Sequence, residues 1–195
     1  MKFKLFQLIL ISFSLTQTIV CQTKNEKEER VKVSEFPELA QTIIKALPKN
    51  CKRLRFYKET DGEKHSFEAK FKYKRQRYSL EFSVNGSIED IEVITNLKNI
   101  KSSAKDSIKA YFKNSFTKYK LIKIQKQHVY TTEMDAVQFL NDVLSQKPKC
   151  IINYEIIAEV KTKKKSEIRE FIFNSNGYFS KSRVLNPTSY EHVLY

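Results

Sequence analysis

The chain has 195 residues, of which 41% are hydrophobic and 30% charged, so it is long enough for one compact domain or two small ones around a shared core. Its 36 basic residues outnumber 22 acidic ones and give a net charge of +14. With three glycines, four prolines and no tryptophan, the composition excludes collagen-like and low-complexity chains.

The N-terminal segment 1–21 has the pattern of a secretion signal. Two lysines precede a short apolar run over residues 5–15. This run is too short to cross a membrane, which takes roughly 20 apolar residues. We therefore expect export, with cleavage between Cys21 and Gln22. The alternative is an outer-membrane lipoprotein lipidated at Cys21, although Val20 is larger than the residue that normally precedes a lipidated cysteine.

Residues 22–33 are polar and without a period, which predicts a disordered leader. A first folded unit is expected over residues 34–97. It starts with a helix that Ser34 caps and Pro48 ends. The apolar face of this helix comprises Phe36, Leu39, Ala40, Ile43, Ile44 and Leu47. Alternating apolar residues and Gly-containing turns then predict four antiparallel strands, around residues 54–56, 67–73, 78–84 and 91–93.

A second unit is expected over residues 98–188, followed by a C-terminal tail at 189–195. Its helix is predicted to begin at Ser103 and to bury Ala104, Ile108, Tyr111, Phe112 and Phe116. Strands follow around residues 122–124, 152–160 and 171–173, and Asn176-Gly177 makes a turn like that at Asn85-Gly86. An additional amphipathic helix is predicted at about 131–146.

The two units match in order. Leu39, Ile43 and Leu47 recur 69 residues later in the second helix, and the Asn-Gly hairpin recurs 91 residues later, so the difference corresponds to the inserted helix. We therefore predict an α+β fold made of a tandem repeat, in which each copy is a helix followed by an antiparallel β-meander and the helices pack on one face of the sheet or sheets.

The chain resembles the PepSY-like family, whose members have the β-lactamase-inhibitor-protein-like fold. The resemblance is carried by "LEFSVNGSIEDIEVI" (80–94), "IKSSAKDSIKAYFKNSF" (100–116), "INYEIIAEV" (152–160) and "FIFNSNGYFSKSRVL" (171–185). The signal is also similar to those of Bacteroidetes-type bacteria, in which glutamine often begins the mature chain. This resemblance implies a secreted or periplasmic protein that binds other proteins or peptides and catalyses nothing.

No motif for chemistry is found. His65, His128 and His192 are isolated, and phosphate-loop, zinc-protease and CxxC patterns are absent, so we predict no catalytic, cofactor-binding or metal-binding residues and no enzyme. Cys51 and Cys150 are a possible disulfide in an oxidising compartment; two separate buried thiols are the alternative.

The face of the sheets opposite the helices is the predicted partner-binding surface. Its candidate residues are Arg55, Tyr57, Lys70, Lys72, Ile157, Ile168 and Ile172. Cations around exposed isoleucines fit a protein partner better than a phosphate backbone. The alternatives are a solvated basic face and isoleucines covered by the inserted helix.

Together these features predict an exported, non-catalytic module, inhibitor-like or peptide- or protein-binding, in the periplasm or cell envelope. Its expected partner is a protein or peptide, with an acidic one as an option. An exported protein seldom meets nucleic acid, which disfavours that ligand. The alternatives are an envelope structural protein without a specific ligand, an anionic-polymer-binding protein and a hydrolase.

Overall fold

The structure, a computed structural model, describes residues 23–186, so the predicted signal segment and the tail at 189–195 lie outside the described residues. Its strands form one ten-stranded sheet in the order β1-β10-β9-β8-β7-β6-β5-β4-β3-β2. The strands are β1 (Thr23–Lys24), β2 (Glu26–Val31), β3 (Lys52–Asp61), β4 (Lys64–Tyr73), β5 (Gln76–Ser83), β6 (Ile88–Thr95), β7 (Lys118–Val129), β8 (Ile152–Lys161), β9 (Ser166–Phe173) and β10 (Phe179–Leu185).

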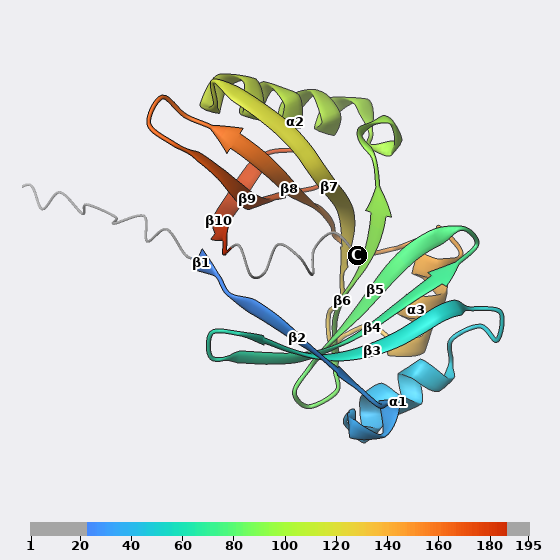
Figure 1. The fold of residues 1–195 in the computed structure, drawn as a ribbon. Coiled ribbons are helices and arrows are strands. Elements are labelled where there is room, and N and C mark those ends of the chain that lie inside the picture. Colours follow the sequence, from blue (N-terminus) through green and yellow to red (C-terminus); the bar gives the residue numbers. More distant parts are fainter. Residues whose placement is uncertain (1–22, 187–195) are drawn as a thin grey trace, which may run out of the picture.

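The sheet curls into a near-barrel that the segment 23–31 closes (Figure 1). β1 pairs in parallel with β10, and β2 pairs antiparallel with β3, with only Asn25 between β1 and β2. The expectation of a disordered leader is therefore wrong for this segment. A charged segment with Val31 as its single apolar residue cannot fold alone, but here both edges of the sheet offer unpaired backbone groups with which it hydrogen-bonds.

Three α-helices lie on the outer side of the sheet within the described chain: α1 (Glu38–Lys45), α2 (Ser102–Ser115) and α3 (Ala136–Leu144) (Figure 1). The predicted α+β class and the tandem helix-plus-meander repeats are wrong, because the protein is a β-rich near-barrel with three short helices. The physical reason is the pairing of β6 with β7, from Asp90↔Val129 to Thr95↔Ile124, which joins all strands into one continuous sheet.

The helices begin at other residues than expected. The chain forms a 3₁₀ turn at Val33–Glu35, and α1 starts only after Pro37, so Ser34 is not its cap. Phe36 is held in an extended conformation because the ring of the following proline disfavours the helical one. The second helix, α2, begins at Ser102, one residue before the expected cap, and has no side-chain cap.

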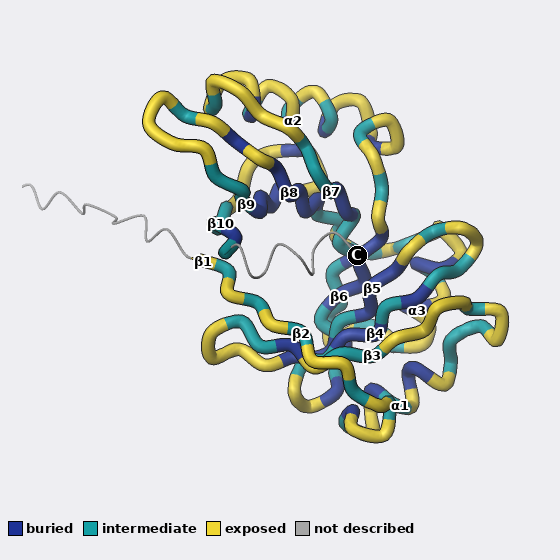
Figure 2. Tube along the Cα trace, viewed as in Figure 1, coloured by how far each residue is buried: buried dark blue, intermediate teal, exposed yellow. Residues whose placement is uncertain are grey.

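Two hydrophobic cores lie between the helices and the outer face of the sheet. The first is covered by α1 and α3 and contains Phe71, Leu80 and Phe82. The second is covered by α2 and contains Ile156, Phe171 and Phe173. Figure 2 shows this buried backbone beneath the helices. The alternation of the strands predicted these core positions correctly. Among the residues predicted for the apolar face of the first helix, Leu39 is wrongly assigned, since it is 49% exposed.

The inserted helix is confirmed at Ala136–Leu144. Asp135 caps it by accepting a hydrogen bond from the Gln138 N–H at 2.7 Å. Its apolar side, Phe139, Leu140, Val143 and Leu144, belongs to the first core. It therefore covers the outer face of the sheet, and the alternative in which it covers Ile157 is wrong.

The two Asn-Gly turns have the geometry that their sequence predicts. Gly86 has φ +85° and Gly177 has φ +79°, a region that residues with a Cβ avoid. In each turn the glycine N–H donates to a carbonyl three residues earlier, Ser83 O at 2.9 Å and Asn174 O at 2.8 Å.

None of the helices over residues 23–186 is long and apolar enough to cross a membrane.

Candidate binding site on the concave face

The concave face of the sheet is polar because the strands alternate. Glu68 lies between Phe67 and Ala69 on β4, so the neighbours that point outward into the first core turn the carboxylate inward. Glu92 on β6 and Glu155 on β8 are placed in the same way between core residues. The concave face therefore carries charged side chains that are largely withdrawn from bulk water.

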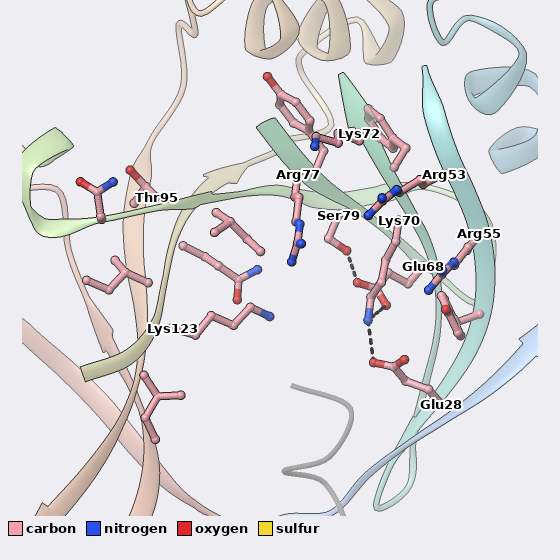
Figure 3. Close-up of a pocket in the computed structure, with 18 of the residues that line it drawn as sticks. Glu28, Arg53, Arg55, Glu68, Lys70, Lys72, Arg77, Ser79, Thr95 and Lys123 are labelled. Atoms are coloured by element: carbon pink, nitrogen blue, oxygen red, sulfur yellow. Dashed lines mark hydrogen bonds and ion pairs between the residues drawn. The ribbon is translucent and has the colours of Figure 1, made fainter. Parts of the chain in front are cut away.

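One cavity of this face, of about 590 Å³, is the basic groove, formed by β3–β5 on one side and β6–β7 on the other (Figure 3). Its lining holds six Lys or Arg residues against two Glu residues. The basic members are Arg53, Arg55, Lys70, Lys72, Arg77 and Lys123. Only Lys70 among them forms an ion pair with a described residue. The other five are available to a ligand.

The wall of the basic groove on β3 is shaped by a β-bulge. The register of β3 against β4 shifts between Lys52 and Arg55, and Arg53 adopts φ +57°. A non-glycine residue at positive φ is strained by roughly 1–3 kcal/mol, a cost typical of positions shaped for binding. Figure 3 shows Arg53 and Arg55 on the same side of the groove.

Lys70 forms the junction between this groove and the rest of the concave face. Its Nζ lies 2.7 Å from Glu28 Oε1 and 2.9 Å from Glu68 Oε2, and 5.0 Å from the centre of the Tyr57 ring. Ser79 also donates a hydrogen bond to Glu68. Burial opposes the charge of Lys70, but Glu68 and Glu28 outweigh this effect and raise its pKa.

A second cavity, of about 530 Å³, is the acidic cavity. It adjoins the basic groove, because both are lined by Glu28, Glu68, Lys70, Lys123 and Gln125. Eleven of its lining residues are Asp or Glu, and six are Lys or Arg. A strongly basic chain thus encloses an interior with an acidic excess.

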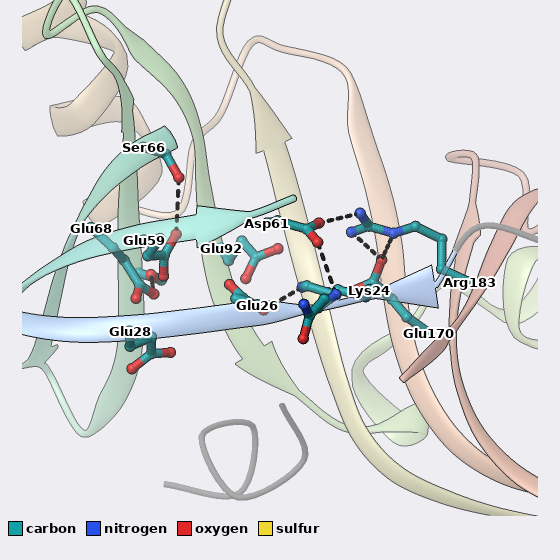
Figure 4. Close-up of polar contacts among 12 residues, drawn as sticks. Lys24, Glu26, Glu28, Glu59, Asp61, Ser66, Glu68, Glu92, Glu170 and Arg183 are labelled. Carbon is teal, nitrogen blue, oxygen red and sulfur yellow. Dashed lines mark hydrogen bonds and ion pairs between the residues drawn. The ribbon is translucent and has the colours of Figure 1, made fainter. Parts of the chain in front are cut away.

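Ion pairs at the closing segment hold part of this acidic cavity together (Figure 4). Lys24 Nζ lies 2.8 Å from Glu170 and 2.8 Å from Glu26. The guanidinium of Arg183 on β10 lies 2.9 Å from Glu170 and 2.6 Å from Asp61 on β3. These contacts connect β9 and β10, near one end of the sheet, to the closing segment and to β3, near the other end. Burial opposes the charge of Glu170, but Lys24 and Arg183 outweigh this effect and lower its pKa.

Five other carboxyls of the acidic cavity form no ion pair with any residue in the described part of the chain: Glu59, Glu81, Asp90, Glu92 and Glu155. Burial and then the charge of Glu155 raise the pKa of Asp90 to about 7. Burial and then the charge of Glu170 raise the pKa of Glu155 to about 7. Burial and Glu68 raise the pKa of Glu59 to about 12, so Glu59 keeps its proton at neutral pH.

The structure places the predicted partner-binding residues in two environments. Arg55, Tyr57, Lys70 and Lys72 all line the basic groove. The three isoleucines are not an exposed apolar patch. Ile157 is 2% exposed and Ile172 8%, while Ile168 is half-buried. The inward curl of the sheet is the reason, since it packs Ile157 and Ile168 against Leu185 of β10 and Ile122 of β7.

The cysteines predicted as a possible disulfide are both free thiols. Each is half-buried at the margin of the first core, and burial raises the pKa of both. The Cys150 sulfur lies 3.7 Å from His128 Nδ1. In this structure they are thus two separate, half-buried thiols.

Sequence reasoning missed the carboxylates of the acidic cavity. Glu89-Asp90 closely follows the Asn85-Gly86 turn, where solvated carboxylates are the usual expectation, whereas Asp90 is only 9% exposed. A signal was present: acidic residues such as Glu68, Glu92 and Glu155 each stand between two core positions in mid-strand. That pattern shows that the carboxylates share a face, but it does not show that the face is enclosed.

No family model matches the chain, and neither does any curated protein. Its fold is similar to that of solved structures from Bacteroides. A DUF2874 family protein from Bacteroides ovatus aligns with TM-score 0.50 and 11% identity over 76% of this chain and 87% of that chain. A candidate periplasmic protein from Bacteroides eggerthii aligns with TM-score 0.50 and 9% identity over 76% and 88%. A BLIP-like protein from Bacteroides fragilis aligns at 0.47, with 11% identity over 76% and 86%. At such identities the first two similarities concern the fold alone, and PepSY-like membership stays a prediction.

Proposed function

We propose that the protein is an exported, non-catalytic binding module that holds an acidic peptide segment of a protein partner in the basic groove. The observation that carries this proposal is the set of five cationic side chains around one cavity, none of which has an ion-pair partner in residues 23–186: Arg53, Arg55, Lys72, Arg77 and Lys123. Carboxylates of a ligand would supply the missing counter-charges, and arginine binds them through two parallel hydrogen bonds.

The other walls of the groove favour a peptide over a bare anion. Tyr57, Tyr78, Ile94, Leu121 and Ile122 line it beside the cations, so a ligand meets apolar and aromatic surface as well as charge. Such a mixture suits a peptide with aliphatic and acidic side chains. A polysaccharide or phosphate polymer would leave the aliphatic wall without a matching group.

One comparison supports export to the periplasm or beyond. A protein of similar fold is described as a candidate periplasmic protein. The predicted signal at residues 1–21 agrees with this location.

Hydrolysis by paired carboxyls is a second candidate with one observation in its favour. Asp90 and Glu155 have pKa values raised to about 7, as a general acid requires. The mechanism also needs a carboxylate that stays ionised as nucleophile or base. The carboxyls of this cavity with lowered pKa values, Glu68 and Glu170, are both held by cations, so we favour binding over catalysis.

A labelled acidic peptide tests the proposal. Fluorescence anisotropy of a fluorescein-labelled Glu-Gly repeat peptide should show saturable binding that weakens as salt is raised. A Gln-Gly repeat peptide of equal length is the ligand control. The double variant Arg55→Ser/Arg77→Ser should bind roughly a hundredfold or more weakly, since each of its two lost charged hydrogen bonds contributes about 1.5–3 kcal/mol.

The control variant Lys163→Ser/Lys164→Ser removes the same charge from the exposed β8–β9 turn, away from both cavities. It should bind almost as tightly as the wild type. An equal loss in both double variants would show that net charge alone attracts the peptide. Equal affinity for the Gln-Gly peptide would contradict acidic recognition.

A further inference from the structure

Three carboxylates form a compact group in the acidic cavity. Glu81 on β5 and Asp90 on β6 are direct partners in the strand register, and Glu92 lies two residues further along β6 on the same face. One oxygen of each carboxylate lies within 4.8 Å of one oxygen of each of the other two. Separations of this size are what three ligands of one ion require, since Ca²⁺–oxygen distances are 2.3–2.6 Å.

The group lacks a counter-charge of its own. Lys64 lies near enough to favour the ionised form of Asp90, and Lys123 does the same for Glu92, but neither forms an ion pair with the group. Lys24 acts likewise on Glu81, while its own ion pairs are with Glu26 and Glu170. Burial and then the charge of neighbouring carboxyls therefore raise the pKa of all three groups, and a bound cation would supply the missing counter-charge.

Asp90 supplies an independent sign of a missing ligand. Its Oδ2 accepts a hydrogen bond from Gln127 at 3.0 Å, but its Oδ1 is buried and has no hydrogen-bond partner in the structure. The residue is only 9% exposed, so bulk water does not replace that partner. A buried acceptor left without a partner costs about 1–3 kcal/mol, more when it is charged.

We propose that Glu81, Asp90 and Glu92 bind a divalent cation, with Ca²⁺ preferred, in the acidic cavity. All the ligands are hard oxygens, with no sulfur or imidazole in the group, which favours Ca²⁺ or Mg²⁺ over zinc or copper. The cavity of about 530 Å³ leaves room for the waters that would complete the coordination. Ca²⁺ tolerates the irregular geometry of carboxylates from adjacent strands, whereas Mg²⁺ demands a near-ideal octahedron.

Two glutamines of β7 orient two of the proposed ligands through hydrogen bonds. Gln127 donates to Asp90, and Gln125 donates to Glu92. Each amide occupies one carboxylate oxygen and leaves the other for an ion, an arrangement typical of the groups that support metal ligands. A second acidic group, Glu26, Glu28 and Glu59, is less suited, because Glu26 and Glu28 are already paired with lysines.

Calorimetric titration of the whole protein with CaCl₂ and with MgCl₂ at neutral pH tests the site. We expect one Ca²⁺ per chain with a dissociation constant of about 10⁻⁴–10⁻³ M, the range of extracellular calcium modules, and weaker Mg²⁺ binding. Ca²⁺ should also raise the melting temperature, since a ligand of the folded state stabilises it. Asp90→Asn and Glu92→Gln should each weaken Ca²⁺ binding by roughly tenfold or more.

Glu155→Gln is the matched control, because Glu155 is also a buried carboxyl without an ion pair in this cavity but lies outside the group of three. It should retain Ca²⁺ binding within a few-fold. Absence of both heat and a melting shift with wild-type protein in millimolar Ca²⁺ would overturn the proposal, as would unchanged affinity in both ligand variants. Peptide binding in the basic groove is measured separately without Ca²⁺, so either proposal can fail alone.

Discussion

Replacing Gly177 by alanine should destabilise the protein far more than the same change in an open turn. Gly177 has φ +79°, where a Cβ costs roughly 1–2 kcal/mol. A Cβ there would also lie 2.8 Å from both the Cα and the carbonyl carbon of Ala104, and nearer still to its oxygen. Ala104 is a fully buried residue in the first turn of α2, so the helix start must move.

The two contributions give the magnitude. Overpacking against a rigid neighbour costs typically 1–3 kcal/mol, so Gly177→Ala should lower the free energy of unfolding by about 2–5 kcal/mol in all. Gly62→Ala is the control: its φ is +63°, but nothing lies within 4 Å of the new Cβ, and only about 1–2 kcal/mol is expected. Gly86→Ala should fall between them, since Pro37 Cβ and Ala40 N each lie 2.9 Å away.

Urea unfolding followed by circular dichroism measures this series, with tyrosine fluorescence as a second probe because the chain has no tryptophan. The midpoints should fall in the order Gly62→Ala, Gly86→Ala, Gly177→Ala, with unchanged slopes. If the losses at positions 62 and 177 were equal, positive φ alone would explain them. The close packing of the turn on α2 would then be refuted.

Three further substitutions, at Lys24, His128 and Ile157, test the stability contributions of buried side chains. Lys24→Met leaves the buried carboxylate of Glu170 without one of its cations, so it should cost about 3 kcal/mol and speed amide exchange over residues 23–31. Lys27→Met, at an exposed position of the neighbouring strand β2, should do neither. Burial lowers the pKa of His128 to about 4, below its unfolded value of about 6.5, so its contribution to stability is complete above pH 6.5 and is lost towards pH 4. Relative to His128→Gln, the wild type should lose about 3 kcal/mol of unfolding free energy over that interval. Parallel pH profiles of the two proteins would contradict the burial of His128. Ile157→Ser should lower the melting temperature through a loss of about 3 kcal/mol, and an unchanged melting temperature would return this residue to the surface.

The strands could be predicted because their pattern is local. Leu80 and Phe82 alternate with polar neighbours and lie in the first core. The glycines of the Asn-Gly pairs that end such runs adopt the positive φ that other residues avoid. The helices were also located, but with errors at their starts. At α1 the error has a local cause, because Pro37 constrains the preceding residue, and that signal was available in the sequence.

The arrangement of the strands could not be predicted in the same way. Residues 23–31 contain almost nothing apolar, and their strand conformation depends on pairing with β3 and β10. These two strands lie close enough for one short segment to pair with both only after the sheet has curled. Curvature comes from twist and from bulges such as that at Arg53, which alternation does not encode. For the same reason the sequence places Ile157 on the correct face of its strand, opposite the helices, but wrongly predicts that it is exposed to solvent.

The location of the two cores explains why the interior can be polar. A small barrel usually fills its interior with apolar side chains, but ten strands leave more room than eight, and here the apolar side chains pack outward beneath the helices. The concave face is thereby free to hold charges whose desolvation would be unfavourable in an isolated core. Six of the eleven carboxyls of the acidic cavity meet cations from the chain itself. The others must take up protons or a ligand cation. Isosteric substitutions of Glu81, Asp90 and Glu92 should therefore alter cation binding more than folding.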